Sequence, residues 1–155
     1  MSNTEDHIDL GIYEIGYSIL PSVAEDKLSV VVEKIKKAIQ GAGGNEIDGE
    51  DPRSIPLSYT MSKTIGARKY VADDAFFGWL KFEIEPENVN KVKVVVEKID
   101  EVLRFLLIKT PRETSFTFAA AEKALEEAEK ARAEAARAAE EPKEAPATEG
   151  EPVVE

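Results

Sequence analysis

The sequence predicts an α+β domain in which two helices cover one face of a four-stranded antiparallel sheet, followed by a flexible C-terminal tail. Four stretches show the two-residue alternation that is typical of strands, and two show the helical spacing of apolar side chains. Their order is β-α-β-β-α-β, which is the ferredoxin-like arrangement and leaves the second face of the sheet free. The composition changes after Thr110. We therefore divide the 155 residues into an acidic N-terminal extension (1–10), a ferredoxin-like domain (11–110) and an Ala- and Glu-rich tail (111–155).

The first predicted strand and helix open the domain. Residues 12–20 alternate, and the core face of this strand is expected to carry Tyr13, Ile15, Tyr17 and Ile19. Ser22 and Glu25 have the spacing of a capping box, which predicts the start of a helix. The helix is expected to end near Gln40, because apolar residues recur at helical spacing up to that point and a glycine-rich stretch follows.

A second strand and a long loop are predicted in the middle of the domain. Residues 45–61 are extended but irregular, since Gly49 and Pro52 interrupt the strand before strict alternation resumes. Residues 62–74 are predicted to form a loop that is longer than an ordinary hairpin turn. This loop contains the only basic cluster outside the predicted helices, which consists of Lys63, Arg68 and Lys69.

The aromatic strand at residues 75–84 organises the rest of the domain. Its core face is expected to carry Phe76, Gly78, Leu80, Phe82 and Ile84. The opposite face begins with two large rings, Phe77 and Trp79, and ends with Lys81 and Glu83. Because the helices cover the core side, we expect this opposite face to stay open and to be available to a partner.

A second helix at residues 86–100 and a fourth strand at 102–109 complete the predicted domain. The helix opens on a proline, and its apolar stripe consists of Val89, Val92, Val96 and Ile99. In the fourth strand, Leu103, Phe105 and Leu107 alternate with Arg104, Leu106 and Ile108. The tail that follows has no comparable stripe of large apolar residues, so we expect it to be disordered or to form a solvated helix.

Charge and composition argue against several classes of function. The net charge is −11: residues 111–155 hold 6 basic and 12 acidic side chains (−6), which leaves 14 basic and 19 acidic (−5) for residues 1–110. A general basic surface for nucleic acid is therefore not expected, although a local basic patch is allowed. The chain has no Cys and only one histidine, His7, so we expect no catalytic thiol or imidazole, no metal site and no cofactor. No apolar run is long enough for a membrane span.

Residues 77–82 resemble part of the first signature of RNA-recognition-motif domains, and they lie on the third strand as that fold requires. In that family a second ring comes from the open face of strand one. Here Tyr13 and Tyr17 are expected on the core face, and Asp73 and Asp74 lie near the position of the usual basic residue. A free-standing module for single-stranded RNA is therefore kept as the alternative function.

Four short motifs, together with the order of elements, carry a second family resemblance. They are Y-E-I at 13–15, L-S-Y at 57–59, W-L-K-F-E-I at 79–84 with P-E-N-V at 86–89, and D-E-V-L-R-F-L-L-I-K at 100–109. With them, residues 13–109 resemble the bacterial small-subunit ribosomal protein number six family. The resemblance implies a non-enzymatic cytoplasmic protein of the ribosome. It also implies pairing with the basic small-subunit protein number eighteen and, with that partner, binding to the central domain of 16S rRNA.

The open face supplies the expected partner-binding residues. A large ring on a rigid strand is a typical interface anchor, so Trp79 is expected to bind the partner protein, assisted by Phe77 and Tyr59. Phe116 and Phe118 in the tail are further candidate contacts. A mildly acidic domain also suits a basic partner, because opposite charges steer association.

The expected phosphate contacts are four basic residues outside the helices: Lys63, Arg68, Lys69 and Arg104. Loops on a rigid sheet reach a nucleic-acid backbone, and such contacts position a protein without reading bases. The alternative is a solvated loop whose charges only balance neighbouring aspartates. The chain also departs from the family at its two Arg pairs, which are replaced by Ile55-Pro56 and Leu103-Arg104. No small-molecule substrate is expected, because the anion-binding loop of acylphosphatases, enzymes with this fold, is missing after strand one.

Overall fold

The structure is a computed structural model that describes residues 9–140. Its elements are β1 (Gly11–Ile19), α1 (Glu25–Gly41), β2 (Asn45–Ile65), β3 (Arg68–Ile84), η1 (Pro86–Asn88), α2 (Val89–Glu97), β4 (Val102–Lys109) and α3 (Phe118–Glu140). The chain forms two compact units, of which the first ends at Ser115 and the second begins at Phe116. The first unit has the predicted β-α-β-β-α-β order, so the ferredoxin-like fold class is confirmed.

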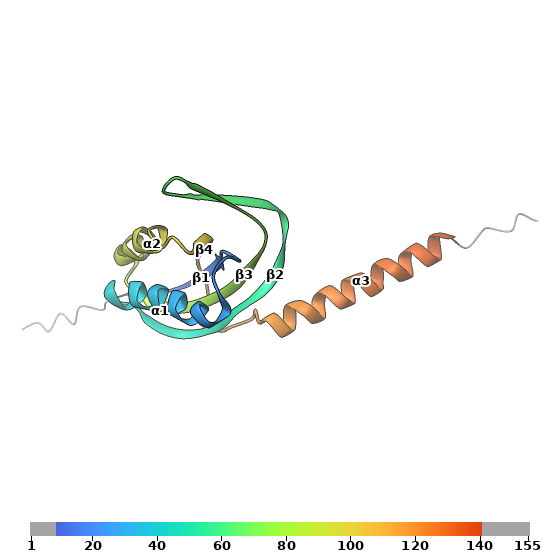
Figure 1. Ribbon diagram of the computed structural model, residues 1–155. Helices are drawn as coiled ribbons and strands as arrows, with labels where there is room; N and C mark the ends of the chain where they lie inside the picture. Colours follow the sequence, from blue (N-terminus) through green and yellow to red (C-terminus); the bar gives the residue numbers. More distant parts are fainter. Residues whose placement is uncertain (1–8, 141–155) are drawn as a thin grey trace, which may run out of the picture. The chain divides into compact units, whose positions relative to one another are not determined.

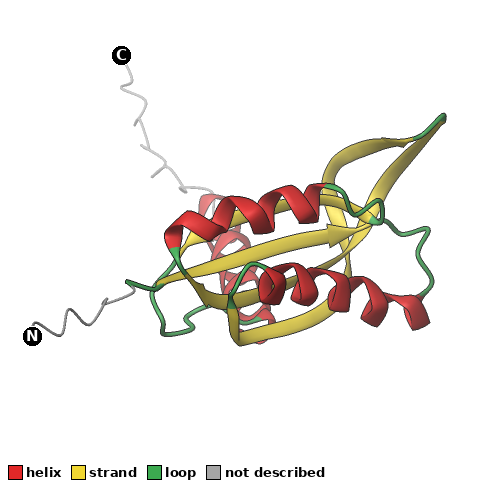
Figure 2. Cartoon of the chain, turned by 90° about the vertical axis from the view of Figure 1, so that its left-hand side faces the viewer, coloured by secondary structure: helices red, strands yellow, loops and turns green. Residues whose placement is uncertain are grey.

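The first unit consists of a sheet with a layer of two helices on one side. The strands lie in the order β2-β3-β1-β4, and all neighbours are antiparallel. Helices α1 and α2 lie side by side over one face, as Figures 1 and 2 show. The core between the layers includes Ile15, Ile35, Phe82, Val92 and Val96, each without exposed surface. Full burial of such a side chain contributes ~1.5–3 kcal/mol, so the strand faces and the helix stripes that meet in this core stabilise the unit together.

Gly78 on β3 makes room for a buried tyrosine. It lies opposite Tyr17 of β1, and a Cβ atom at position 78 would come within 2.6 Å of the Tyr17 hydroxyl oxygen. Tyr17 is only 1% exposed, and burial raises the pKa of its hydroxyl well above the ordinary value. A side chain at position 78 is therefore excluded by the packing of its cross-strand neighbour.

Both core helices start or end differently from the prediction. The expected capping box at Ser22 is wrong: α1 begins at Glu25, and its N-cap residue, Ala24, makes no side-chain hydrogen bond. The preceding chain instead turns tightly, with the Val23 N–H donating to the Leu20 carbonyl at 3.1 Å. The second predicted helix is divided into the 3-10 turn η1 and the nine-residue α2, which ends at Glu97.

The predicted loop at residues 62–74 is wrong, because this segment is a β-hairpin. Strand β2 continues to Ile65, β3 begins at Arg68, and these two residues pair across a turn made by Gly66 and Ala67. Gly66 has φ +61°, a left-handed conformation that glycine adopts without steric cost at the first position of a two-residue hairpin turn.

Apolar residues on one face of the hairpin explain why it is ordered. A second small core contains buried Leu20, Ala72, Ala75 and Leu103, with Val23, Leu57, Met61, Ile65 and Tyr70 packed against it. The hairpin therefore folds back over the end of the sheet, and Figure 1 shows it curving toward the α2 side. The burial of this face explains why the segment forms a hairpin and not the predicted loop.

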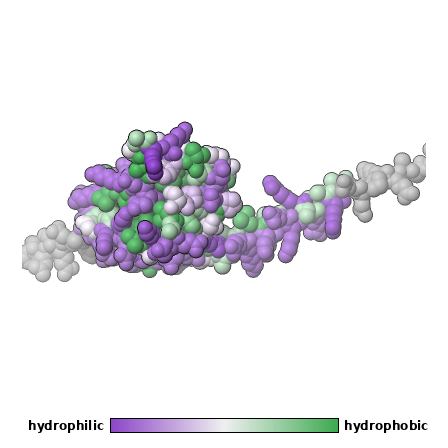
Figure 3. Space-filling model, in the orientation of Figure 1, coloured by the Kyte–Doolittle hydropathy of each residue, from purple (hydrophilic) through white to green (hydrophobic). Residues whose placement is uncertain are grey.

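The second unit contains a long solvated helix. The side chains of residues 122–139 in α3 are all exposed, including Leu125 at 66%. The visible surface of this helix is mostly hydrophilic in Figure 3. Thr117 supports its first turn, since its hydroxyl accepts a hydrogen bond from the Ala120 N–H at 3.1 Å. Residues 122–139 thus lie in a solvated helix, while residues 141–155 lie outside the described part.

Candidate functional site

The sheet face that points away from the helices is the candidate functional site, and we refer to it as the open face. The strand registers arrange its side chains in three rows that run across β4, β1, β3 and β2. The rows are Arg104-Ser18-Phe77-Arg53, Leu106-Gly16-Trp79-Glu50 and Ile108-Glu14-Lys81-Asp48. Residues directly opposite each other in a sheet share a face, so these rows form one continuous surface.

The β4 side of the open face is apolar and exposed. Leu106 is 65% exposed and Ile108 is 44% exposed. Gly16 has no side chain between Leu106 and Trp79, and the Phe77 ring lies close to it: a Cβ atom at position 16 would be 3.5 Å from that ring. Leu106, Ile108 and Phe77 therefore form the apolar patch of the open face.

Trp79 is buried, although it was expected to be exposed on the open face. It is 1% exposed, and its indole Nε1 donates a hydrogen bond to the Glu50 carboxylate at 2.7 Å. Glu50 lies opposite Trp79 in the register between β2 and β3. The part of the open face around Trp79 is thus closed to a partner.

Lys81 is also buried, although it was expected on a free surface. It is 1% exposed, and its Nζ donates to the carbonyl oxygens of Pro111 at 3.2 Å and Glu113 at 3.1 Å and to the Thr114 hydroxyl at 3.3 Å. An ammonium group has three protons, so these three acceptors satisfy it completely. A buried charge is tolerated only when it is paired or hydrogen-bonded in this way.

The segment at residues 111–114, which we call the strap, crosses the open face. It follows β4, where the Thr110 N–H donates to the Ile12 carbonyl of β1, and Arg112 then pairs with Glu83 of β3 at 3.0 Å. The Thr114 hydroxyl donates to the Asp48 carboxylate of β2 at 2.6 Å. This hydrogen bond is the main reason why the pKa of Asp48 lies below its ordinary value. The first unit therefore ends at Ser115, beyond the predicted boundary at Thr110.

Lys63 has a structural role in the hairpin. Its Nζ donates to the Ile99 carbonyl at 3.0 Å and to the Val102 carbonyl, between the end of α2 and the start of β4. Burial lowers the pKa of this ammonium, while Asp100 and Glu101 oppose the shift. Lys63 therefore holds the hairpin against the rest of the unit.

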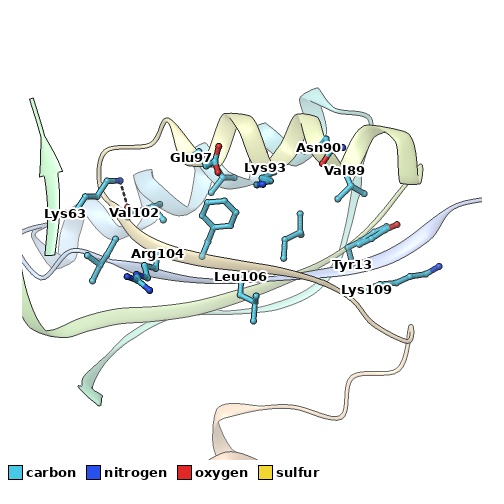
Figure 4. Close-up of a pocket in the computed structure, with 14 residues that line it drawn as sticks. Tyr13, Lys63, Val89, Asn90, Lys93, Glu97, Val102, Arg104, Leu106 and Lys109 are labelled. Carbon is cyan, nitrogen blue, oxygen red and sulfur yellow. Dashed lines mark hydrogen bonds between the residues drawn. The ribbon is translucent and has the colours of Figure 1, made fainter. Parts of the chain in front are cut away.

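The other basic candidates are exposed. Arg68 and Lys69 follow the hairpin turn, and Arg104 lies on the open face of β4. A groove of about 670 Å³ runs between α2 and β4, with Lys63 at one end (Figure 4). Arg104, Lys93 and Lys109 line it together with one acidic side chain, Glu97. The structure thus brings Lys63 and Arg104 to one groove, which Arg68 and Lys69 do not line.

The remaining partner candidates lie in different places. Tyr59 is 58% exposed, in the part of β2 between Pro56 and Met61 where the register with β3 shifts. Phe116 and Phe118 belong to the second unit, where their rings meet edge to face with centroids 6.1 Å apart. Phe118 is buried, and Phe116 is partly exposed. Among the expected partner residues of the first unit, the structure brings only Phe77 and Trp79 together on the open face.

Two kinds of feature are absent from residues 9–140. No helix in this range is long and apolar enough to cross a membrane. Within the same range, no group of three or more acidic, Cys or His side chains is arranged to hold a metal ion.

Comparison with known proteins gives consistent matches. The profile of the family described as Ribosomal protein S6 matches residues 12–109. The chain is 22% identical over 117 residues to the small ribosomal subunit protein bS6 of Prochlorococcus marinus subsp. pastoris, covering 72% of this chain and 71% of that protein. It is 24% identical over 97 residues to bS6 of Phocaeicola vulgatus, covering 63% and 78%. The crystal structure of 30S ribosomal protein S6 from Thermotoga maritima has the same fold, with a TM-score of 0.55, 19% identity, and coverage of 77% of this chain and 98% of that one.

Proposed function

The chain belongs to the ribosomal protein S6 family, and from this premise we propose that it pairs with small-subunit protein number eighteen and, with it, contacts 16S rRNA. Proteins of this family are structural, non-enzymatic constituents of the small ribosomal subunit. The observation that carries the pairing is the exposure of two apolar side chains, Leu106 and Ile108, on the rigid open face, with the half-buried Phe77 beside them. Exposed apolar patches on rigid surfaces mark protein interfaces.

Charge supports the same partner. Residues 1–110 carry a net charge of −5, from 14 basic and 19 acidic side chains. An acidic domain attracts a basic protein at long range, and the basic partner then supplies most of the phosphate contacts that an acidic domain lacks. The alternative, a free-standing module that stacks single-stranded RNA on this face, needs exposed rings. Trp79 is buried, so this alternative has less support.

Leu106→Asp is expected to weaken binding of the purified partner protein at least tenfold, because a carboxylate at the centre of an apolar contact must be desolvated. Isothermal titration calorimetry measures the affinity, and circular dichroism checks the fold. Val71→Asp is a matched control, since Val71 is 62% exposed on a strand of the same unit but lies on the hairpin. Equal affinities of the parent and Leu106→Asp, or an equal loss in Val71→Asp, would refute this docking site.

Tyr59 and Phe77 remain candidate partner contacts in this proposal. Trp79 would stabilise the open face without touching the partner, because a direct contact would require the release of its hydrogen bond to Glu50. Phe116 and Phe118 remain candidate contacts of the second unit.

The RNA contacts are proposed to involve Arg68, Lys69 and Arg104, which are exposed, whereas Lys63 is engaged with two carbonyl oxygens. Replacing the three exposed cations by Ala should reduce the magnitude of the slope of log K against log salt by about two to three units. Each phosphate contact that no longer forms leaves its counterions on the RNA, so fewer are released on binding. Filter binding of the protein pair to a central-domain rRNA fragment measures the slope. The control replaces Lys123, Lys130 and Arg132 of α3 by Ala. An unchanged slope in the variant that lacks Arg68, Lys69 and Arg104 would mean that these side chains face solvent and do not contact the RNA.

A further inference from the structure

Lys81 is a buried ammonium on the face that the proposed function assigns to a partner. Within residues 9–139 it is the only charged side chain that is buried. Its three hydrogen-bond acceptors are two carbonyl oxygens and one hydroxyl, and all of them belong to the strap. The strap therefore supplies the hydrogen-bond acceptors that water would supply to Lys81 if this face were exposed to solvent.

A partner that took the place of the strap would have to satisfy Lys81 in the same way. Covering an ammonium without acceptors is strongly unfavourable, because the group loses its hydration and gains nothing in return. A basic partner would in addition bring like charge to this position. Removal of the strap therefore opposes docking of the partner instead of preparing for it.

We propose that the strap stays in place when the partner docks, and that Lys81 thereby confines the docking surface to the β4 side of the open face. This inference rests on the proposed function. The surface that remains contains Leu106 and Ile108, with Phe77 beside Gly16. Glu14 lies between Ile108 and Lys81 in the third row, so a half-buried carboxylate borders the apolar patch on the side of the strap. A basic partner finds a carboxylate there, while the strap covers the nearby cation.

The strap can be locked without removing it, because the chain contains no cysteine. Asp48 and Thr114 are joined by a 2.6 Å hydrogen bond, so a cysteine pair at these positions is the lock to test, and its disulfide requires the two Cβ atoms to approach to about 3.5–4.5 Å. The variant Asp48→Cys/Thr114→Cys has a locked strap when oxidised. The hydroxyl acceptor of Lys81 is missing in both redox states. The reduced protein has a loosened strap because it also lacks any bond between position 114 and β2. Mass spectrometry confirms the redox state.

We expect the oxidised variant to bind purified small-subunit protein number eighteen within about twofold of the parent, and the reduced variant to bind about fivefold more weakly. Lys81→Met in the reduced variant should restore most of the loss, because no charge then needs the strap. Loss of binding in the oxidised form, or tighter binding in the reduced form, would show that the partner displaces the strap. Equal affinities of the oxidised and reduced forms would also overturn the inference.

Two further comparisons separate the possible failures. If the disulfide does not form, Thr114→Val replaces the reduced form and is expected to show the same loss of binding. Thr114→Ser, which keeps the hydroxyl, is its control. If the parent itself does not bind the partner, the proposed pairing and the inference both fall. If the parent binds and Leu106→Asp does not, the proposed docking site stands whatever the strap variants show.

Discussion

Trp79→Ala is expected to lower the free energy of unfolding of the first unit by ~3–5 kcal/mol, the usual cost of truncating a buried aromatic side chain. The ring is 1% exposed, and its Nε1 is bonded to Glu50. Truncation therefore leaves a cavity and also removes the hydrogen-bond donor of a carboxylate. Urea unfolding followed by circular dichroism measures the change, since the variant loses the only tryptophan and its fluorescence.

Two milder substitutions provide the controls for Trp79→Ala. Trp79→Phe keeps most of the volume, and Glu50→Gln keeps an oxygen that can accept the indole hydrogen bond, so each should cost less than the truncation. A Trp79→Ala variant within ~1 kcal/mol of the parent would contradict close packing of this ring. Loss of partner binding in Trp79→Ala does not identify a contact, because the sheet itself is disturbed. Leu106, which is exposed, is the better probe of the interface.

Ending the chain after Thr110 is expected to cost ~1–3 kcal/mol more stability than ending it after Ser115, since only the longer chain keeps the acceptors of Lys81. The shorter chain also loses the ion pair between Arg112 and Glu83, which lies partly in solvent and contributes little. The difference between the two truncations isolates the strap from the second unit. Thermal unfolding of both proteins at one pH and salt concentration measures it.

Lys81→Met tests the cause of the difference between the truncations. In the chain that ends at Thr110, the methionine needs no acceptors, so the difference from the Ser115 chain should shrink. Equal unfolding temperatures of the two lysine-containing truncations would mean that water replaces the strap at no cost. The boundary predicted at Thr110 would then describe the stable unit.

The sequence predicted the parts of the fold in which apolar periodicity has one interpretation. Strand β1 buries Ile15 and Ile19 as expected, and α1 buries Ile35 and Ile39 of its predicted stripe. The hairpin was missed because Lys63, Arg68 and Lys69 made the segment appear to be a solvated loop. Its order depends on contacts of Met61 and Tyr70 with residues far away in the sequence, which periodicity does not reveal.

The candidate site was predicted only in part, for a related reason. The register places Phe77 and Trp79 on the open face, as alternation requires, but it does not show that Trp79 is buried there. Lys81 carried no signal of burial, because its acceptors are backbone carbonyls of the strap. Leu106 and Ile108 did carry a signal: the run F-L-L-I at 105–108 is apolar on both faces of a strand. In such a run one face of the strand packs against the core, and the other face is an exposed apolar surface of the kind that binds a partner protein.

The strand order has a consequence for the way the chain acquires its structure. Strand β1 lies between β3 and β4, which both follow much later in the chain, whereas β2 and β3 are joined by a two-residue turn. Local pairs close at low entropic cost, so the β2–β3 hairpin is expected to form early, and the pairing of β1 should limit the folding rate. During synthesis, the first strand to leave the ribosome has no complete set of neighbours until β4 has also emerged. Its apolar side chains, including Ile15 and Ile19, stay unprotected for most of the time needed to make the domain.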